Sequence, residues 1–368
     1  MITYCSNIHP GESFEDIFLN LQTHLLTVKK AVSPKESFSI GLRLSNRAAF
    51  EIDKKVSAQF REWCQEHDCF VPTINGFPYG PFNSAPIKEK VYLPDWRHLE
   101  RVIYTEQLAT LLDSWLPEGV KGSISTVPVG FRGHLTEKDY PIIRRNLLDV
   151  LEHLDRLKQE SGKEIILSLE PEPGCLLETV EDTLQFFEQM GFPEELKGSL
   201  GICLDCCHQA VEFESPLESL KLLYEAKIKI GKVQISSALR MERFERKILE
   251  RFCEPYYLHQ VVVRRKDGTF AHYNDLPEAL LSHRGDHGEE WRIHFHLPIF
   301  IEKMDHYGTT RSFIEEILPL LDREILLEVE TYTWNVLPLE LRTETITQSI
   351  IREIEWVKAQ RDETNRCS

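Results

Sequence analysis

Short apolar or β-branched runs alternate with longer amphipathic stretches along almost the whole 368-residue chain. Nine runs have the length and composition of buried strands: 2–8, 39–45, 69–75, 122–128, 164–170, 199–205, 232–236, 292–299 and 324–330. Between them apolar residues recur at helical spacing, as Ile143, Leu147, Val150 and Leu154 do. Regular alternation of strand and helix predicts parallel βαβ units.

Eight such units in roughly 250 residues or more make a (β/α)8 TIM barrel. We therefore predict one α/β TIM-barrel domain over residues 1–360, followed by a frayed polar tail at 361–368. The sequence has nine candidate strands, one more than a TIM barrel contains. We therefore predict that 252–306, after strand seven, is an insertion over the barrel mouth. The alternative is a doubly wound open sheet. That fold usually has a glycine-rich loop after its first strand, and neither GxGxxG nor GxxxxGK[ST] occurs here.

Composition disfavours several classes of protein. The chain has 43 Lys and Arg against 59 Asp and Glu, a net charge of −16, whereas nucleic-acid binding needs a basic face. No apolar run approaches the roughly 20 residues that span a bilayer, and the N-terminal MITYCSNIHPGE lacks the features of a signal peptide. Nine cysteines, an odd number, suggest reduced thiols. We therefore expect a cytoplasmic protein that binds a small molecule, with no nucleic acid and no membrane insertion.

Three of the predicted barrel strands end in carboxylates. The fifth ends in Glu170, the sixth ends in Asp205 with His208 three residues later, and the last ends in Glu328 and Glu330. Each acid alone would more often be a solvent-facing strand end, but the carboxyl ends of barrel strands meet at one mouth, where TIM-barrel active sites lie. Carboxylates that meet at one mouth repel each other, and they cannot all stay ionised without a cation. We therefore predict a divalent metal site with mixed oxygen and imidazole ligands.

The motifs LSLEPEP, LGICLDCCHQA and VQISSALR resemble consecutive strand ends of the xylose-isomerase-like TIM barrels. That group includes sugar-phosphate isomerases, ketose 3-epimerases and apurinic endonucleases. The resemblance implies a metal set of Glu on strand five, Asp on strand six with a His three residues later, His on strand seven and Glu on strand eight. Glu170, Asp205 and His208 match this pattern, and Glu328 matches the last position, with Glu330 as its near alternative.

Motifs spread over nearly the full length are also similar to one subgroup, the EboE metabolite traffic proteins. They are TYCSNIHPGE, INGFPYG, LDCCHQAVEFE, KVQISSALR and LEVETYTWNVLP. This similarity implies a role in processing or trafficking a secondary-metabolite precursor, alongside other proteins of the same gene cluster. It does not identify a reaction.

One position departs from the pattern: Gln234 stands where the relatives carry the strand-seven histidine. An amide oxygen binds hard cations weakly compared with imidazole. The segment RIHFHLPI alternates His294 and His296 onto one face, and we expect His296 to supply the imidazole and to lie nearer the acids than His283 or His287. The alternatives are a Gln234-based site, a site that has lost its metal, or histidines that only form hydrogen bonds. With His296 the site suits Mn²⁺ or Zn²⁺, and with oxygen ligands alone Mg²⁺.

The resemblance also implies roles for the remaining groups. A carboxylate of the pair Glu170/Glu328 would move a proton as general base, next to a cation that polarises a carbonyl and its adjacent hydroxyl. The candidate metal ligands are Glu170, Asp205, Gln234, His296 and Glu328. The candidate substrate-binding residues are His9, Asn75, His208, Arg240, Glu330 and Trp334. The alternatives are a non-catalytic metabolite-binding or scaffold protein on the same fold and, least favoured by the charge, a DNA-repair enzyme.

Overall fold

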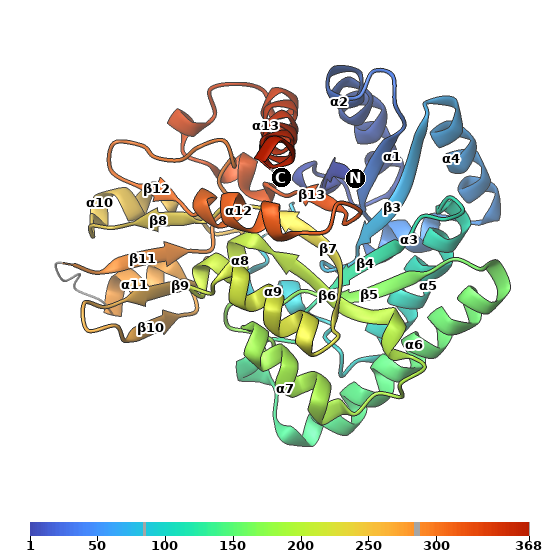
Figure 1. The fold of residues 1–368 in the computed structure, drawn as a ribbon, viewed down its shortest axis with the longest axis horizontal. Coiled ribbons are helices and arrows are strands. Elements are labelled where there is room, and N and C mark those ends of the chain that lie inside the picture. Colours follow the sequence, from blue (N-terminus) through green and yellow to red (C-terminus); the bar gives the residue numbers. More distant parts are fainter. Residues whose placement is uncertain (84–85, 283–287, 368) are drawn as a thin grey trace.

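The computed structural model describes residues 1–83, 86–282 and 288–367. Eight parallel strands form a nearly closed barrel with helices around it (Figure 1), which confirms the predicted TIM barrel. Around the barrel the strands follow the order β1-β13-β7-β6-β5-β4-β3-β2. Their bounds are β1 (Ile2–Tyr4), β2 (Phe38–Arg43), β3 (Cys69–Asn75), β4 (Gly122–Thr126), β5 (Ile165–Leu169), β6 (Leu200–Asp205), β7 (Lys229–Ile235) and β13 (Leu327–Val329).

The outer helices bury the apolar stripes that the sequence shows. Helix α6 buries Ile143, Leu147, Val150 and Leu154 and ends at Gly162, whose φ of 76° suits a residue without a side chain. The helices are α1 (Phe14–Asn20), α2 (Leu26–Val32), α3 (Asn46–Glu51), α4 (Lys54–Glu66), α5 (Leu99–Trp115), α6 (Tyr140–Ser161), α7 (Val180–Met190), α8 (Cys206–Val211), α9 (Pro216–Glu225), α10 (Arg246–Leu249), α11 (Leu276–Ser282), α12 (Arg311–Ile317) and α13 (Ile346–Cys367).

The barrel closes at the seam between β1 and β2. A single bridge joins Cys5 to Gly41 there. The Thr3 hydroxyl completes the seam, because it donates to the Ser39 carbonyl at 2.6 Å and accepts from the Gly41 N–H at 3.2 Å. A side chain at position 41 would collide with the Tyr4 carbonyl and the Glu328 carboxylate. The seam therefore needs glycine at this position.

An insertion between β7 and β13 forms a second, five-stranded sheet beside the barrel, next to α8 (Figure 1). Its order is β10-β9-β11-β8-β12, with β8 (Leu239–Met241), β9 (Val261–Arg264), β10 (Phe270–Tyr273), β11 (Glu290–Ile293) and β12 (Gly308–Thr309). The predicted insertion after strand seven is thus confirmed. The sheet begins before residue 252, because β8 pairs with both β11 and β12.

The predicted strand 292–299 lies outside the barrel, within the insertion, and is shorter than predicted. Strand β11 ends at Ile293, because the Phe295 N–H turns back to the Ile293 carbonyl at 2.8 Å and interrupts the ladder. The following segment runs back to the barrel, where the Leu297 N–H donates to the Ser237 carbonyl at 2.8 Å. This return brings His294 and His296 to the mouth.

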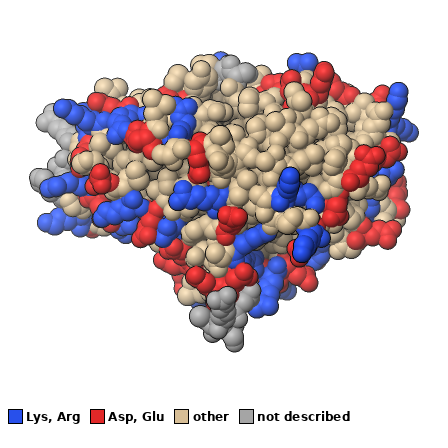
Figure 2. Space-filling view, turned by 90° about the horizontal axis from the view of Figure 1, so that it is seen from above, with Lys and Arg blue, Asp and Glu red and all other residues tan. Residues whose placement is uncertain are grey.

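Helix α13 packs through Ile350, Ile354 and Val357 and continues to Cys367, into the segment predicted to be a tail. No helix in the described ranges is long and apolar enough to cross a membrane. On the face shown in Figure 2, basic and acidic side chains are interspersed.

The β1–β2 seam gives a test of the closure. Gly41→Ala should lower the free energy of unfolding by at least about 2 kcal/mol, because the added methyl overlaps backbone that cannot move without opening the seam. Gly80→Ala is the matched control, since a side chain there meets open space. Urea denaturation of both variants measures the difference. Equal stability of the two would show that the seam tolerates a side chain.

Candidate metal and substrate site

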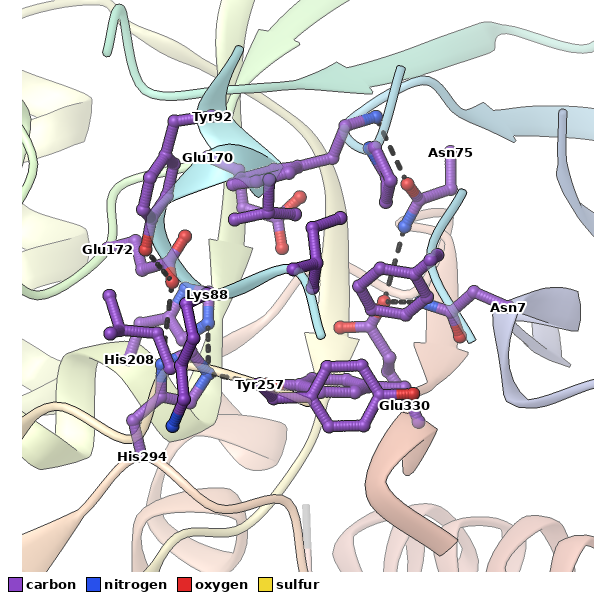
Figure 3. A pocket seen from close by; sticks show the side chains of 17 residues that line it. Asn7, Asn75, Lys88, Tyr92, Glu170, Glu172, His208, Tyr257, His294 and Glu330 are labelled. Atoms are coloured by element: carbon purple, nitrogen blue, oxygen red, sulfur yellow. Dashed lines mark hydrogen bonds and ion pairs between the residues drawn. The ribbon is translucent and has the colours of Figure 1, made fainter. Parts of the chain in front are cut away.

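The carboxyl ends of the barrel strands and the insertion enclose one pocket, with a cavity volume of about 60 Å³. Its polar lining is labelled in Figure 3 and consists of Asn7, Asn75, Lys88, Tyr92, Glu170, Glu172, His208, Tyr257, His294 and Glu330. Apolar side chains line the rest, and Phe82, Tyr257 and Tyr332 form a small buried aromatic cluster at its edge. The pocket is therefore polar along the strand ends and aromatic around them.

Three acids meet at the strand ends. Glu170 follows β5, Asp205 ends β6 and Glu330 follows β13, and each offers an oxygen within 4.8 Å of the others. All three are at most 5% exposed. Burial, followed by the charge of Glu330, raises the pKa of Glu170 well above its ordinary value. Burial and then Asp205 raise the pKa of Glu330 to about 8. Bringing these acids together without a cation is therefore costly.

Asp205 differs from the other two acids of this cluster in the direction of its pKa shift. Although burial opposes ionisation, electrostatic interaction with the neighbouring His208 and His296 imidazoles and a hydrogen bond from Ser236 lower the pKa of Asp205. Its Oδ1 accepts from the Ser236 hydroxyl at 2.6 Å and from the N–H groups of Cys207 and His208 at 2.7 and 3.0 Å. These bonds orient the carboxylate so that Oδ2 is left free.

Every candidate metal ligand has a buried atom without a hydrogen-bond partner in the described part of the chain. Three of these atoms are Glu170 Oε2, Asp205 Oδ2 and His296 Nε2, and the others belong to Glu328 and Gln234. A buried polar atom that lacks a partner costs roughly 1–3 kcal/mol. Asp205 belongs to two groups of close ligand atoms, one with Glu170 and Glu330 and one with His208 and His296, so a divalent cation bound to Asp205 would lie next to both groups. The residues present therefore fit a metal ion.

His296 has the tautomer that a metal ligand needs. Its Nδ1 donates to the Glu330 carbonyl at 2.8 Å. Burial lowers the pKa of His296 to about 4, so the ring is neutral at pH 7 and Nε2 carries a lone pair. Nε2 lies 4.0 Å from Asp205 Oδ2. Ligating histidines commonly bind an acceptor through the other ring nitrogen in this way.

Glu328 and Glu330, which the sequence left as alternatives, have different surroundings. The Glu328 carboxylate forms an ion pair with Lys232, and both side chains are fully buried. Within the described residues Glu328 belongs to none of the clusters of close ligand atoms, whereas Glu330 does. Asn7 and Asn75 donate to Glu330 Oε1 at 2.7 and 3.2 Å. Asn75, predicted to bind substrate, thus orients an acid as well as lining the pocket.

Gln234 is buried on β7 in register with Asp205 and Glu328. Both atoms of its amide lack a hydrogen-bond partner among the residues described. It therefore remains a candidate ligand beside His296.

Three predicted substrate-binding residues lie away from the pocket. His9 and Trp334 line a separate cavity, where His9 stacks on His24 with ring centroids 4.3 Å apart. Arg240 lies on β8 of the inserted sheet, where its guanidinium contacts Glu290 at 2.9 Å. None of the three directly ends a barrel strand: His9 follows the 3-10 turn Ser6–Ile8, Trp334 lies in the 3-10 turn Tyr332–Val336, and Arg240 lies in β8. His283 and His287 lie outside the described residues.

Several pocket residues were not predicted from the sequence. Tyr92 donates to Glu172 Oε1 at 2.7 Å, and Gln260 of the insertion donates to the same oxygen at 3.1 Å. Of these residues, only Glu172 could have been placed in the pocket from the sequence. It lies two residues after Glu170 and therefore falls on the same face of an extended chain.

Helix α13 anchors the site from outside through Glu353. Its Oε1 accepts from the Thr331 hydroxyl at 2.7 Å and from the Ile299 N–H at 3.1 Å. Thr331 follows Glu330, and Ile299 lies three residues after His296. One buried carboxyl therefore holds together the two segments that carry these ligands.

The Lys232–Glu328 pair can be tested as a structural element. Lys232→Met should lower the free energy of unfolding by about 3–5 kcal/mol, because it leaves a buried carboxylate without its partner. The double variant Lys232→Met/Glu328→Met should be more stable than the single one, since no charge then remains unpaired. A double variant that is less stable than Lys232→Met would contradict this assignment. Chemical denaturation measures both.

Glu353 predicts a pH dependence of stability. Burial raises the pKa of Glu353 to about 7 from 4.5. The native state therefore holds this proton more tightly than the unfolded chain. The stabilisation is complete below about pH 4.5 and is lost as the pH rises through about 7. Glu353→Gln stays neutral, so its stability relative to wild type should rise by about 3 kcal/mol between pH 4.5 and 8.

The control for that experiment is Glu355→Gln, which changes an exposed acid on the same helix. Thermal or urea unfolding across the pH range gives the difference. A Glu353→Gln profile parallel to wild type would show that the carboxyl is ionised in the folded protein.

No protein-family model and no curated protein matches this chain. Among solved structures, an L-ribulose 3-epimerase matches with a TM-score of 0.54 and 12% identity, covering 100% of this chain and 95% of that one. A xylose isomerase domain protein from Planctomyces limnophilus matches at 0.52 and 14%, covering 89% and 90%. The IOLI protein with a bound zinc atom matches at 0.51 and 16%, covering 99% and 98%. These likenesses show that the chain shares the TIM-barrel fold of these proteins.

Proposed function

We propose that this protein is a metal-dependent TIM-barrel protein of the sugar isomerase or epimerase type, acting on a small polar metabolite. The observation that carries the proposal is that two groups of close ligand atoms, Glu170–Asp205–Glu330 and Asp205–His208–His296, meet at Asp205, and that three buried atoms of these groups lack partners. The structural neighbours include an L-ribulose 3-epimerase and a zinc-bound protein, which supports this type of chemistry.

Glu170, Asp205, Glu330 and His296 are the proposed ligands, with Glu330 in the position that the sequence assigned first to Glu328. Three carboxylates and one imidazole suit Mn²⁺ or Zn²⁺. A divalent cation held here would polarise a substrate carbonyl and its neighbouring hydroxyl, which acidifies the adjacent C–H.

The chain itself supplies the proton transfer and the enclosure. Glu170 and Glu330 both reach the pocket, and a carboxylate with a raised pKa is suited to hold or release a proton near neutral pH. Asn7 and Asn75 fix Glu330, so its orientation does not depend on substrate. Phe82, whose ring packs against Tyr332, helps to exclude water. We assign the general-base role to Glu170 or Glu330 rather than to Glu328.

A non-catalytic metabolite-binding protein is the second candidate. Two observations favour it: Gln234 replaces the expected histidine, and Arg240 is held by Glu290 away from the pocket. The motifs similar to EboE proteins support a role with a secondary-metabolite precursor, which either candidate could fill. About one equivalent of Mn²⁺ in the purified protein favours the enzyme, and a metal-free protein that binds a metabolite favours the second candidate.

The ligand assignment predicts the effects of single substitutions on Mn²⁺ affinity. His296→Ala and Glu330→Gln should weaken binding by more than about 100-fold, because each removes a ligand. Asn75→Ala, which only releases Glu330, should weaken it about 10–100-fold, as outer-shell changes do. Gln234→Ala should have a modest effect. Equilibrium dialysis with elemental analysis measures the bound metal.

His9→Gln is the matched control, because His9 is an equally buried histidine in another cavity and should leave binding unchanged. Unchanged metal in His296→Ala would show that this imidazole is structural and that any site depends on Gln234.

A further inference from the structure

A second group of potential ligands forms one wall of the pocket. Glu172, His208 and His294 lie together on the side away from Glu330 (Figure 3). Each offers a ligand atom within 4.8 Å of the others, and all three are buried. The two imidazoles face each other through their Nε2 atoms, which are 3.1 Å apart.

Both rings have their Nδ1 atoms occupied as donors. His208 Nδ1 lies 2.9 Å from the Pro171 carbonyl, which can only accept. His294 Nδ1 lies 2.7 Å from Gln260 Oε1, which can also only accept. In the neutral rings the hydrogen is therefore on Nδ1, and both Nε2 atoms carry lone pairs.

The orientation of Gln260 is determined independently of the histidines. Its Nε2 lies 2.8 Å from the Pro173 carbonyl and 3.1 Å from Glu172 Oε1, so this end must be the amide NH₂. It also donates to the Tyr92 oxygen at 2.8 Å, whose own hydrogen goes to Glu172. The opposite end is therefore the carbonyl that faces His294.

The Tyr332 hydroxyl lies 3.3 Å from His294 Nε2 but has no contact of this kind with His208 Nε2 among the described residues. Two lone pairs that face each other at 3.1 Å repel unless a proton or a cation lies between them. The separation suits a cation: two nitrogens at the usual 2.0–2.1 Å from zinc and 3.1 Å apart subtend about 100° at the metal. Two imidazoles and one carboxylate are also a ligand set of catalytic zinc sites, in which the fourth position stays open.

We propose that Glu172, His208 and His294 bind a second divalent cation of the zinc type, with its open position toward the pocket. All three residues line the cavity, so this position is available to an oxygen of a small-molecule ligand. The proposed ligand set has no residue in common with Glu170, Asp205, Glu330 and His296, although the two sites adjoin, because His208 also offers an atom within 4.8 Å of Asp205 and His296. Its nitrogen-rich ligands favour Zn²⁺, whereas the acidic cluster also accepts harder cations.

Zinc stoichiometry tests the second site. Metal-free protein dialysed against Zn²⁺ should bind two equivalents, measured by elemental analysis. His294→Gln and Glu172→Gln should each bind one, because only the acidic cluster remains. Glu330→Gln should also bind one, held by the imidazole pair. Co²⁺ in Glu330→Gln should show the visible absorption of a four-coordinate site, and Glu330→Gln/His294→Gln should lose it.

His259→Gln is the matched control for removal of a buried imidazole from the insertion. Both of its ring nitrogens already have partners, the His294 carbonyl and Glu254 Oε1, each at 2.8 Å. This variant should keep two equivalents, and circular dichroism checks that every variant is folded. Two equivalents in folded His294→Gln and Glu172→Gln would overturn the proposal, as a shared proton between the rings would then explain their contact.

The outcomes also separate this site from the proposed function. One equivalent in wild type that survives Glu330→Gln but not His294→Gln would support the second site and reject the acidic one. One equivalent that is lost in Glu330→Gln and kept in His294→Gln would do the reverse. One equivalent that is lost in both would show a single shared centre and would overturn the proposal.

Discussion

The burial of four carboxylates inside one barrel is the constraint on which the rest of this structure depends. Glu170, Asp205, Glu328 and Glu330 are all at most 5% exposed. Isolated ionised carboxylates are very costly in such surroundings unless they are paired or bind a metal. Lys232 compensates Glu328 deep in the barrel. The three acids nearer the mouth have raised pKa values or a free oxygen atom, which is the arrangement that a cation would stabilise.

The inserted sheet completes the mouth that the barrel strands leave unfinished. Strand β7 presents Gln234 where an imidazole would be expected, and the chain returns after β11 to place His296 beside Asp205 and Glu330. The same return positions His294 against His208. The inserted sheet, which spans residues 239–309 between β7 and β13, thus contributes to the site as directly as a barrel strand does. Glu353 on α13 ties this returning segment to the end of β13.

Much of the fold was accessible from the sequence, because buried parallel strands are continuous apolar runs and the acids that close them stand out. The choice between Glu328 and Glu330 was not accessible: residues two apart share a face, and the distinction depends on Lys232, whose position becomes clear only when β7 and β13 pair. Arg240, His9 and Trp334 were placed at the mouth by their position in the chain. Pairing within the inserted sheet and packing at the second cavity place them elsewhere.

Anomalous scattering from crystals soaked in Mn²⁺ tests the central claim most directly, because it locates the cation without reference to activity. We predict a peak at coordination distance from Glu170, Asp205, Glu330 and His296. The absence of a peak at full Mn²⁺ saturation, or a peak held by Glu328 and Gln234 with His296 turned away, would contradict this prediction.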